Sequence, residues 1–272
     1  MDPNAEILHH VALTNSRLGS PGFALADWEN FEVFTESSES LEARGIQIVG
    51  KMVEGNKVVL HSKLGNCKLR INFCGKTNSS VYLGSGHRVN GTITLDGQNN
   101  LFSASGFGFQ GQNSISVTLS ASNSAIVFCK DVTSVNSARL LNGNTKRALI
   151  GDDCMFSWDI YVRNFDSHAI FDIETLTQIN TPGDILIDKH CWIGQGATII
   201  KSLSIGAGSI VGVRSVVTKN VPSKVAVGGV PAKILRRGVT WSRHWLVGET
   251  EMRALRDCMI DPPVVDPELS DI

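Results

Sequence analysis

The chain has 272 residues and a formal net charge of −1 at pH 7. A charge so close to zero argues against a general nucleic-acid-binding protein. The sequence has no apolar run of about 18 residues that would predict a membrane-spanning helix. The segment from Met1 to Asn30 lacks the basic start and apolar core of a secretory signal. We therefore expect a cytoplasmic protein, built as one elongated domain with extensions or as two domains.

Residues 1–50 show no repeat. Trp28, Phe31 and Phe34 stand among polar residues, and an acidic run follows from Glu36 to Glu42. We interpret this region as a non-repeat N-terminal extension, and the sequence does not reveal what it does.

Aliphatic residues spaced six apart dominate residues 51–230. The late series is unbroken and comprises Ile187, Ile193, Ile199, Ile205, Val211 and Val217. An earlier series comprises Leu83, Val89, Leu95, Leu101 and Phe107, and a less regular stretch rich in Ser and Asn separates the two. A period of six fits neither a helix nor an ordinary strand. It is typical of a parallel β-helix, in which each hexapeptide forms one side of a triangular coil and the aliphatic side chains stack inside. We predict an all-β solenoid of hexapeptide repeats over residues 51–230.

The six cysteines are dispersed along the chain and show no C-x-x-C spacing. Disulfides and zinc are therefore not expected. Cys154 and Cys191 each lie four residues after a repeat aliphatic, Ile150 and Ile187. We expect both to be small buried side chains inside the coil.

One long loop, residues 163–186, interrupts the repeat. Loops of this length are often functional. This one carries a single histidine, His168, between Asp166 and Asp172. A neutral imidazole can accept a proton at pH 7, and a nearby carboxylate can fix its tautomer. His168 is a candidate general base, and the alternative is an ordinary solvated loop histidine.

Residues 231–272 follow the repeat as a basic segment, a short helix and a tail. Lys233, Arg236 and Arg237 supply the positive charge. Residues 250–259 predict a helix with Thr250 as its N-cap. The tail after Asp261 contains three prolines and is expected to be loosely ordered.

Three runs carry a resemblance to a known family: Ile187-Asp-Lys-His-Cys-Trp-Ile-Gly194, then Gly212 to Lys219, then Val227 to Lys233. They resemble the hexapeptide-repeat acyltransferases, strongly over about residues 147–240 and more loosely over about 55–146. The resemblance implies a left-handed parallel β-helix, a homotrimer, and acetyl-CoA or a related acyl-CoA as donor substrate. The loop motif from Asp166 to Asp172, followed by Asn180 and Trp192, is most similar to the polysaccharide O-acetyltransferases.

The resemblance also implies roles for particular residues. His168 would be the catalytic base, with Asp166 and Asp172 as supporting acids. The acyl-CoA would be bound by Trp192, Gln195, Val213, Thr218, Lys219, Lys233 and Arg236. Lys233 stands where relatives often have an arginine. A lysine ammonium does not offer the bidentate hydrogen-bonding geometry with which arginine binds phosphate. Two alternatives stay open: Trp192 packs against a neighbouring subunit, and the basic residues form a solvated end.

The leading functional hypothesis is an acetyl-CoA-dependent O-acetyltransferase that acts on a sugar hydroxyl of a surface polysaccharide or its precursor. One alternative is an N-acetyltransferase acting on the amino group of a nucleotide-linked amino sugar, and another is an inactive scaffold solenoid. No metal is expected, because His190 is the only histidine of the late repeats and no cluster has ligand spacing. The sequence names neither the sugar nor the position that is acylated.

Overall fold

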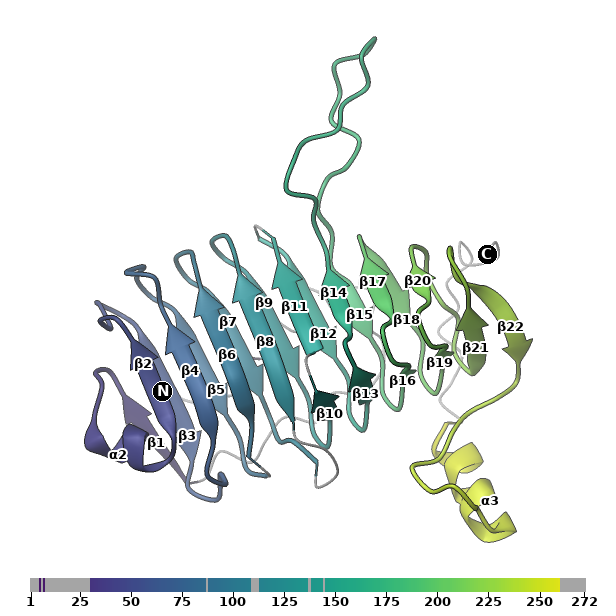
Figure 1. Ribbon diagram of the computed structural model, residues 1–272, viewed down its shortest axis with the longest axis horizontal. Helices are drawn as coiled ribbons and strands as arrows, with labels where there is room; N and C mark the ends of the chain where they lie inside the picture. The colour runs from purple at the N-terminus through teal and green to yellow at the C-terminus, as the bar shows by residue number, and fades with distance from the viewer. Residues whose placement is uncertain are drawn as a thin grey trace.

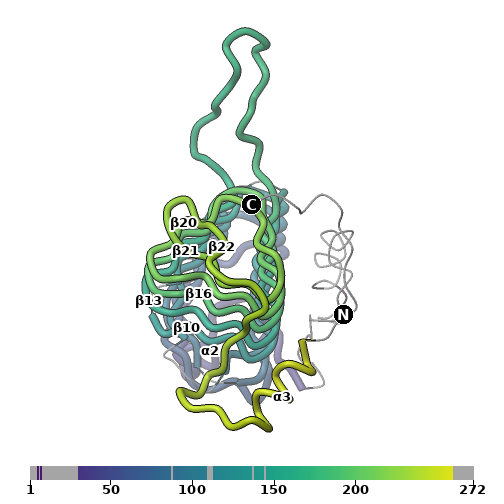
Figure 2. The backbone as a smooth tube through the Cα atoms, turned by 90° about the vertical axis from the view of Figure 1, so that its right-hand side faces the viewer, coloured from purple at the N-terminus to yellow at the C-terminus, as the bar shows by residue number. Residues whose placement is uncertain are grey.

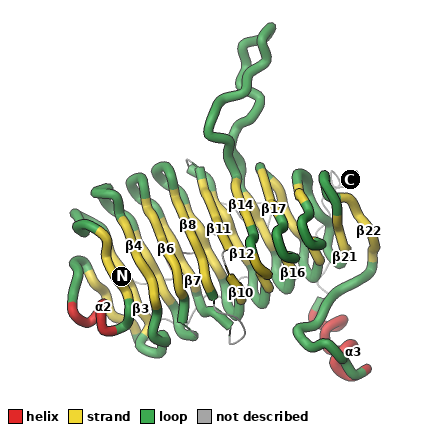
Figure 3. The backbone as a smooth tube through the Cα atoms, viewed as in Figure 1, coloured by secondary structure: helices red, strands yellow, loops and turns green. Residues whose placement is uncertain are grey.

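The computed structural model describes residues 5, 7, 30–86, 88–108, 113–136, 138–143 and 145–259. Trp28, most of the expected N-terminal extension and the proline-containing tail lie outside the described residues. The described chain winds into a three-faced coil of parallel strands, elongated along the coil axis (Figure 1). Within residues 30–259, as far as the structure describes them, helices lie only near the ends of the coil, as Figure 3 shows. No helix in the described part of the chain is long and apolar enough to cross a membrane.

We number the three faces in the order in which each late coil visits them, as residues 147–163 do. The first face contains β1 (Phe31–Phe34), β3 (Lys57–His61), β5 (Ser80–Leu83), β7 (Leu101–Ala104), β9 (Ala125–Phe128), β12 (Arg147–Ile150), β15 (Ile185–Ile187) and β18 (Leu203–Ile205). The second face contains β10 (Thr133–Asn136), β13 (Met155–Trp158), β16 (Trp192–Ile193), β19 (Ile210–Val211), β21 (Val225–Gly228) and β22 (Lys233–Arg237). The third face contains β2 (Ile46–Val49), β4 (Lys68–Asn72), β6 (Asn90–Leu95), β8 (Ser114–Leu119), β11 (Ala138–Asn142), β14 (Tyr161–Arg163), β17 (Thr198–Ile200) and β20 (Val216–Val217).

The late coils follow the hexapeptide period. Ile187 pairs with Ile205, and Ile199 pairs with Val217, so each partner stands three repeats further along the chain. Three hexapeptides therefore make one coil. Parallel pairing stacks each residue on its counterpart, so the inward aliphatic side chains form continuous columns. The prediction of a hexapeptide solenoid is confirmed here.

The early coils are longer than three hexapeptides and differ in length. Val58 pairs with Val81, and Val81 pairs with Phe102, and neither separation is a multiple of six. A six-residue phase cannot be kept between such coils. On β7, Phe102 and not Leu101 points into the coil, so the expectation that Leu101 stacks inside is wrong. The other members of the early series are buried in the core as expected: Leu83, Val89, Leu95 and Phe107.

A second apolar cluster covers the outer side of the first face. It contains Leu101, Val59, Tyr82 and Leu149, and Ile7 is fully buried within it. At least this part of the N-terminal region therefore packs on the first face. Burial of apolar surface is worth roughly 25 cal/mol per Å², which gives the contact a stabilising role.

A ladder of polar side chains lies in the corner between the third face and the first face. Its members come from successive coils: Asn56, Ser79, Asn100, Ser124, Asn142 and Asn164. Asn56 Oδ1 accepts a hydrogen bond from the Ser79 amide at 2.9 Å, and Asn100 Oδ1 accepts one from the Ser124 amide at 3.0 Å. These side chains satisfy backbone groups that turn the corner inside the protein.

The ends of the coil and its cysteines complete the fold. Strands β1 and β22 pair antiparallel with β3 and β21. Helix α2 (Glu39–Ala43) precedes the first coil, and α3 (Glu249–Cys258) follows the last strand.

The predicted N-cap at Thr250 is wrong, because α3 begins after Gly248 and Thr250 lies in its first turn. Cys154 and Cys191 are fully buried inside the coil, as expected.

Candidate active site

The loop predicted to carry the catalytic histidine forms a long arm, residues 164–184. It leaves the coil between β14 and β15, at the corner between the third and first faces, and extends away from the rest of the chain (Figures 1 and 2). Its two sides are joined by an antiparallel bridge between Phe171 and Gln178. The arm carries His168 with its side chain exposed.

Both roots of the arm are fixed to the coil. Asn164, at the end of the polar ladder, accepts a hydrogen bond from the Gly143 amide at 2.8 Å and donates one to Asn142. Asp184, at the other root, accepts one from the Arg147 amide at 2.8 Å. Because Asn164 is almost completely buried, the arm begins from a rigid base.

Asn180 braces the two sides of the arm around His168. Its Nδ2 donates to Asp166 Oδ2 at 3.0 Å and to the carbonyl oxygen of His168 at 2.8 Å. Its Oδ1 accepts from the Ile170 amide at 2.7 Å. One amide group therefore holds the backbone on both sides of the imidazole. Among the described residues, no hydrogen bond engages the His168 ring itself, so a proton-accepting nitrogen is open to solvent or substrate.

Asp172 forms its hydrogen bonds within the tip of the arm. Its Oδ1 accepts from the Thr175 amide at 2.7 Å, the Thr175 hydroxyl at 3.0 Å and the Glu174 amide at 3.0 Å. The bonds from Thr175, backbone first, lower the pKa of Asp172 below its ordinary value. This carboxylate closes the turn at the tip of the arm, and the structure does not bring it to His168.

A cavity of about 250 Å³ lies at the root of the arm. Among the residues that line it are Asp166, Asn180, Lys201, Ser202 and Thr218. The structure thus brings together a predicted catalytic residue, Asp166, and a predicted cofactor residue, Thr218. Lys201 adds a positive charge that the sequence did not single out. Lys219 follows Thr218 at the same corner and is exposed.

Trp192 lies on the second face. Its ring nitrogen donates to Ser157 Oγ at 3.2 Å, and the residue is 36% exposed. The ring centroid lies 6.1 Å from that of Trp241, with the planes tilted by 47°. The Trp192 side chain therefore projects outward from the coil.

The other predicted cofactor residues are spread over the late coils. Gln195 and Val213 turn the corner between the second and third faces, where the Gln195 carbonyl accepts from the Arg214 amide at 2.7 Å. Val213 is 65% exposed. Lys233 and Arg236 project from β22 and are exposed. One chain does not gather these residues into a single pocket.

His168 and Trp192 lie on different sides of the molecule. The arm leaves from the corner between the third and first faces, whereas Trp192 projects from the second face, which lies opposite that corner. Figure 1 shows the arm rising from one side and β16 at the other. Within one chain, the candidate base and the candidate donor-binding tryptophan therefore lie apart.

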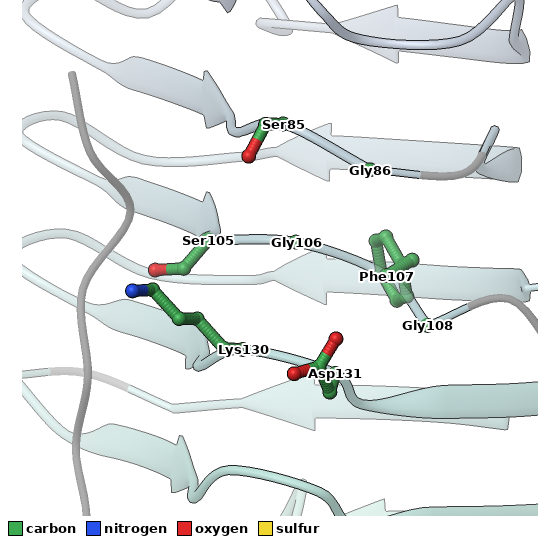
Figure 4. Close-up of a pocket in the computed structure, with 8 residues that line it drawn as sticks. All are labelled: Ser85, Gly86, Ser105, Gly106, Phe107, Gly108, Lys130 and Asp131. Carbon is green, nitrogen blue, oxygen red and sulfur yellow. The ribbon is translucent and has the colours of Figure 1, made fainter. Parts of the chain in front are cut away.

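A second cavity, of about 300 Å³, lies among the earlier coils. Figure 4 shows it lined by Ser85, Ser105, Lys130 and Asp131, together with the backbone of glycines such as Gly106. None of the predicted site residues lines this cavity.

The sequence does not reveal the part that two residues, Asn180 and Lys201, play in the candidate site. Asn180 belongs to the loop motif, but nothing in the sequence shows that its amide spans the arm. Lys201 is a basic residue in a turn, with φ of 73°, and has no signal to separate it from other surface lysines. Both roles follow from the shape of the arm, which residue spacing does not encode.

Comparisons with known proteins bear on the fold and on the kind of protein to which this chain is similar. No family model matches the chain. A polysialic acid O-acetyltransferase of Escherichia coli O1:K1 / APEC is 39% identical over 94 residues, which are 35% of this chain and 31% of that enzyme. A polysialic acid O-acetyltransferase of Neisseria meningitidis is 29% identical over 126 residues, 46% of this chain and 56% of that enzyme. The crystal structure of the polySia specific acetyltransferase NeuO matches with a TM-score of 0.63 and 26% identity, over 78% of this chain and 97% of that chain.

The chain spans less than two thirds of the length of these two sequence relatives. Its relatives are polysialic acid O-acetyltransferases and hexapeptide-repeat acetyltransferases. Its fold is the left-handed β-helix of the acyltransferases, so the predicted fold class is confirmed.

Proposed function

We propose that this protein is an acetyl-CoA-dependent O-acetyltransferase that acetylates a sugar hydroxyl of a surface polysaccharide or its precursor. The observation that carries the proposal is the open imidazole of His168, held on a braced arm of a fold shared with a polysialic acid O-acetyltransferase. We assign the reaction to the coil domain, residues 51–230, with the arm inserted in it. Residues 1–50 and 231–272 flank this domain.

In the proposed reaction, His168 accepts the proton of the sugar hydroxyl as the oxygen attacks the carbonyl carbon of the acetyl thioester. The new C–O bond forms, the C–S bond breaks, and the CoA sulfur takes the proton from His168. A general base of this kind contributes about 10²–10⁴-fold in rate. Asn180 holds Asp166 and the His168 backbone in place. Asp166 supports the base through this network, and Asp172 supports it by closing the tip of the arm.

The active site is proposed to lie between copies of a homotrimer. The arm carries His168 away from its own coil, and five apolar residues of the arm are exposed: Ile170, Phe171, Ile173, Leu176 and Ile179. Exposed apolar side chains that cluster on one element are typical of an interaction surface. Docking of the arm on a neighbouring copy would bury them and bring His168 to the partner's second face.

Acetyl-CoA is proposed to bind along the late coils without a metal. Trp192 and Val213 would supply apolar contacts to the acyl donor, and Gln195 and Thr218 polar ones. Lys219, Lys233 and Arg236 would face the phosphates through charge-assisted hydrogen bonds. The basic residues are exposed, so each contact is screened by solvent and contributes modestly.

The test is acetyl transfer by the full chain. The protein is incubated with acetyl-CoA and three acceptors separately: polysialic acid, a neutral oligosaccharide and a nucleotide-linked amino sugar. Released CoA thiol gives the rate, and mass spectrometry identifies the acylated product. We expect transfer to a polysaccharide hydroxyl. Transfer to the amino sugar instead would identify an N-acetyltransferase, and normal CoA binding without transfer to any acceptor would contradict the proposal.

A further inference from the structure

The C-terminal segment that follows β22 returns along the coil and packs beside Trp192. Residues 238–245, the C-terminal strap, run along the corner between the first and second faces, where they contact Lys224, His190 and Asp153. The strap is attached at its start, where the Val239 amide donates to the Lys224 carbonyl at 3.0 Å. Its central residue, Trp241, is only 5% exposed.

Trp241 is held by His190, which turns the same corner two residues before Trp192. The two rings are stacked, with centroids 4.4 Å apart and planes at 11°. Trp241 Nε1 donates to the His190 carbonyl at 2.8 Å, and His190 Nε2 lies 2.9 Å from the Trp241 carbonyl. His190 Nδ1 lies 2.6 Å from Asp153 Oδ2. Two reciprocal hydrogen bonds and a stacked pair define both the position and the plane of the indole.

Arg243 fastens the strap two residues further on. Its Nε donates to Asp153 Oδ1 at 2.8 Å, and one terminal nitrogen donates to Thr133 Oγ1 at 2.8 Å. The other terminal nitrogen donates to the Asp131 carbonyl at 3.2 Å. Asp153 therefore bridges His190 and Arg243, and the strap is tied to three successive turns of the corner.

The strap determines how Trp192 is presented. Trp241 packs at 6.1 Å against one side of the Trp192 ring, and Ser157 fixes the ring nitrogen. About a third of Trp192 stays open to solvent. Two independent supports on a surface tryptophan leave it little freedom to change rotamer. Such preorganisation reduces the entropy lost when a ligand binds.

We infer that Trp241 is a positioning residue for acyl-donor binding, and that the C-terminal strap forms part of the donor site by holding Trp192 in its binding orientation. The inference rests on the proposed function in one respect, the contact of Trp192 with the acyl donor. Trp241 acts through Trp192 and His190 and does not itself touch the reacting atoms.

The test compares Trp241→Ala with the wild-type chain in steady-state kinetics and in calorimetric binding of CoA. An aromatic pair of this kind is worth enough that its loss should raise KM for acetyl-CoA and Kd for CoA about three- to tenfold. The value of kcat should stay within about twofold, because His168 is untouched. Trp241→Phe, which keeps the ring on His190, should restore most of the affinity. A merely structural role would lower Tm and leave KM unchanged.

Two further variants keep the test decisive. Trp245→Ala, in the same strap but 95% exposed, should behave as the wild type. Arg243→Gln loosens the strap without removing the indole. Its KM and Kd therefore test the inference even if Trp241→Ala does not fold. Folded Trp241→Ala and Arg243→Gln proteins with KM and Kd within about twofold of the wild type would overturn the inference. CoA binding can be measured without an acceptor. A wild type that binds CoA but transfers no acetyl group would refute the proposed function. The comparison of Kd for CoA between the wild type and the variants would still decide the inference about Trp241.

Discussion

At the scale of single residues, the polar side chains of the arm differ in how they use their hydrogen-bonding groups. His168 keeps an open ring, whereas Asn180 uses both ends of its amide to hold the arm. Asp172, also close to His168 in the sequence, is occupied by Thr175. Sequence proximity therefore indicates the candidate base and its two acids but cannot distinguish the acids, because a turn inside the arm directs them differently.

Replacement of the proposed base gives the first prediction. His168→Ala should lower kcat about 10²–10⁴-fold, the contribution of one general base. The side chain is exposed, so Tm and CoA affinity should not change. Turnover is measured by release of CoA thiol, and CoA binding by calorimetry. A variant that binds CoA normally and still turns over within about fivefold of the wild type would exclude His168 as the base.

Asn180→Ala should misplace the base without removing it. Loss of both Nδ2 bonds frees the His168 backbone, and small displacements of a catalytic group can cost about 10- to 100-fold in kcat. Gln178→Ala is the matched control, because its amide contacts Asn180 from the same side of the arm. We expect kcat to fall in the first variant and to stay near the wild type in the second. Equal rates for Asn180→Ala and the wild type would show that the brace has no catalytic effect.

Asp153 gives the strap a defined response to acid. Burial pushes its pKa up, but the hydrogen bond from His190 and the charge of Arg243 outweigh burial and leave it below the ordinary 3.8. A carboxyl group with a lowered folded-state pKa stabilises the fold above its unfolded-state pKa, and this stabilisation is lost as pH falls through the folded-state value. Tm should therefore fall more steeply between about pH 4 and pH 2 in the wild type than in Asp153→Asn. Parallel curves would contradict this role.

At the scale of elements, the inward positions of the late coils follow the predicted six-residue period throughout, whereas those of the early coils follow it only in part. A coil of three hexapeptides keeps a strict six-residue phase, so inward positions are visible in the sequence. The early coils are longer and vary in length, so they lose that phase, as the outward position of Leu101 shows. The Ser- and Asn-rich stretch looks irregular because part of it supplies the polar ladder, in which the Ser124 hydroxyl donates to the Gly143 carbonyl and the Asn142 amide donates to the Ala125 carbonyl inside a corner.

The packing of the C-terminal strap could not be predicted from the sequence, because it depends on residues far apart in the chain. Trp241 and Arg243 follow the last strand in a region whose local pattern shows only basic residues and a helix. Their partners, His190 and Asp153, lie 51 and 90 residues earlier. Contacts between distant residues depend on the winding of the coil, which a local pattern does not reveal.

At the scale of the whole molecule, the arrangement of the faces separates the two halves of the proposed site. The arm leaves one corner, and Trp192 projects from the opposite face. The exposed apolar residues of the arm are where we propose that a neighbouring copy docks. A trimer with the active site between copies reconciles these observations with acetyl transfer.

The most direct test of this account is complementation between two inactive variants. His168→Ala and Trp192→Ala chains, each with low activity alone, are co-expressed with different affinity tags, and the mixed oligomer is isolated through both tags. If the arm of one copy acts on the donor site of the next, some interfaces in the mixed oligomer pair an intact His168 with an intact Trp192. We predict that acetyl transfer returns to roughly a third of the wild-type rate, because every mixed trimer contains one interface of three at which both residues are intact. Mixed oligomers that are as inactive as either parent variant would contradict an active site shared between copies. A fully active monomer of the wild-type chain would contradict it as well.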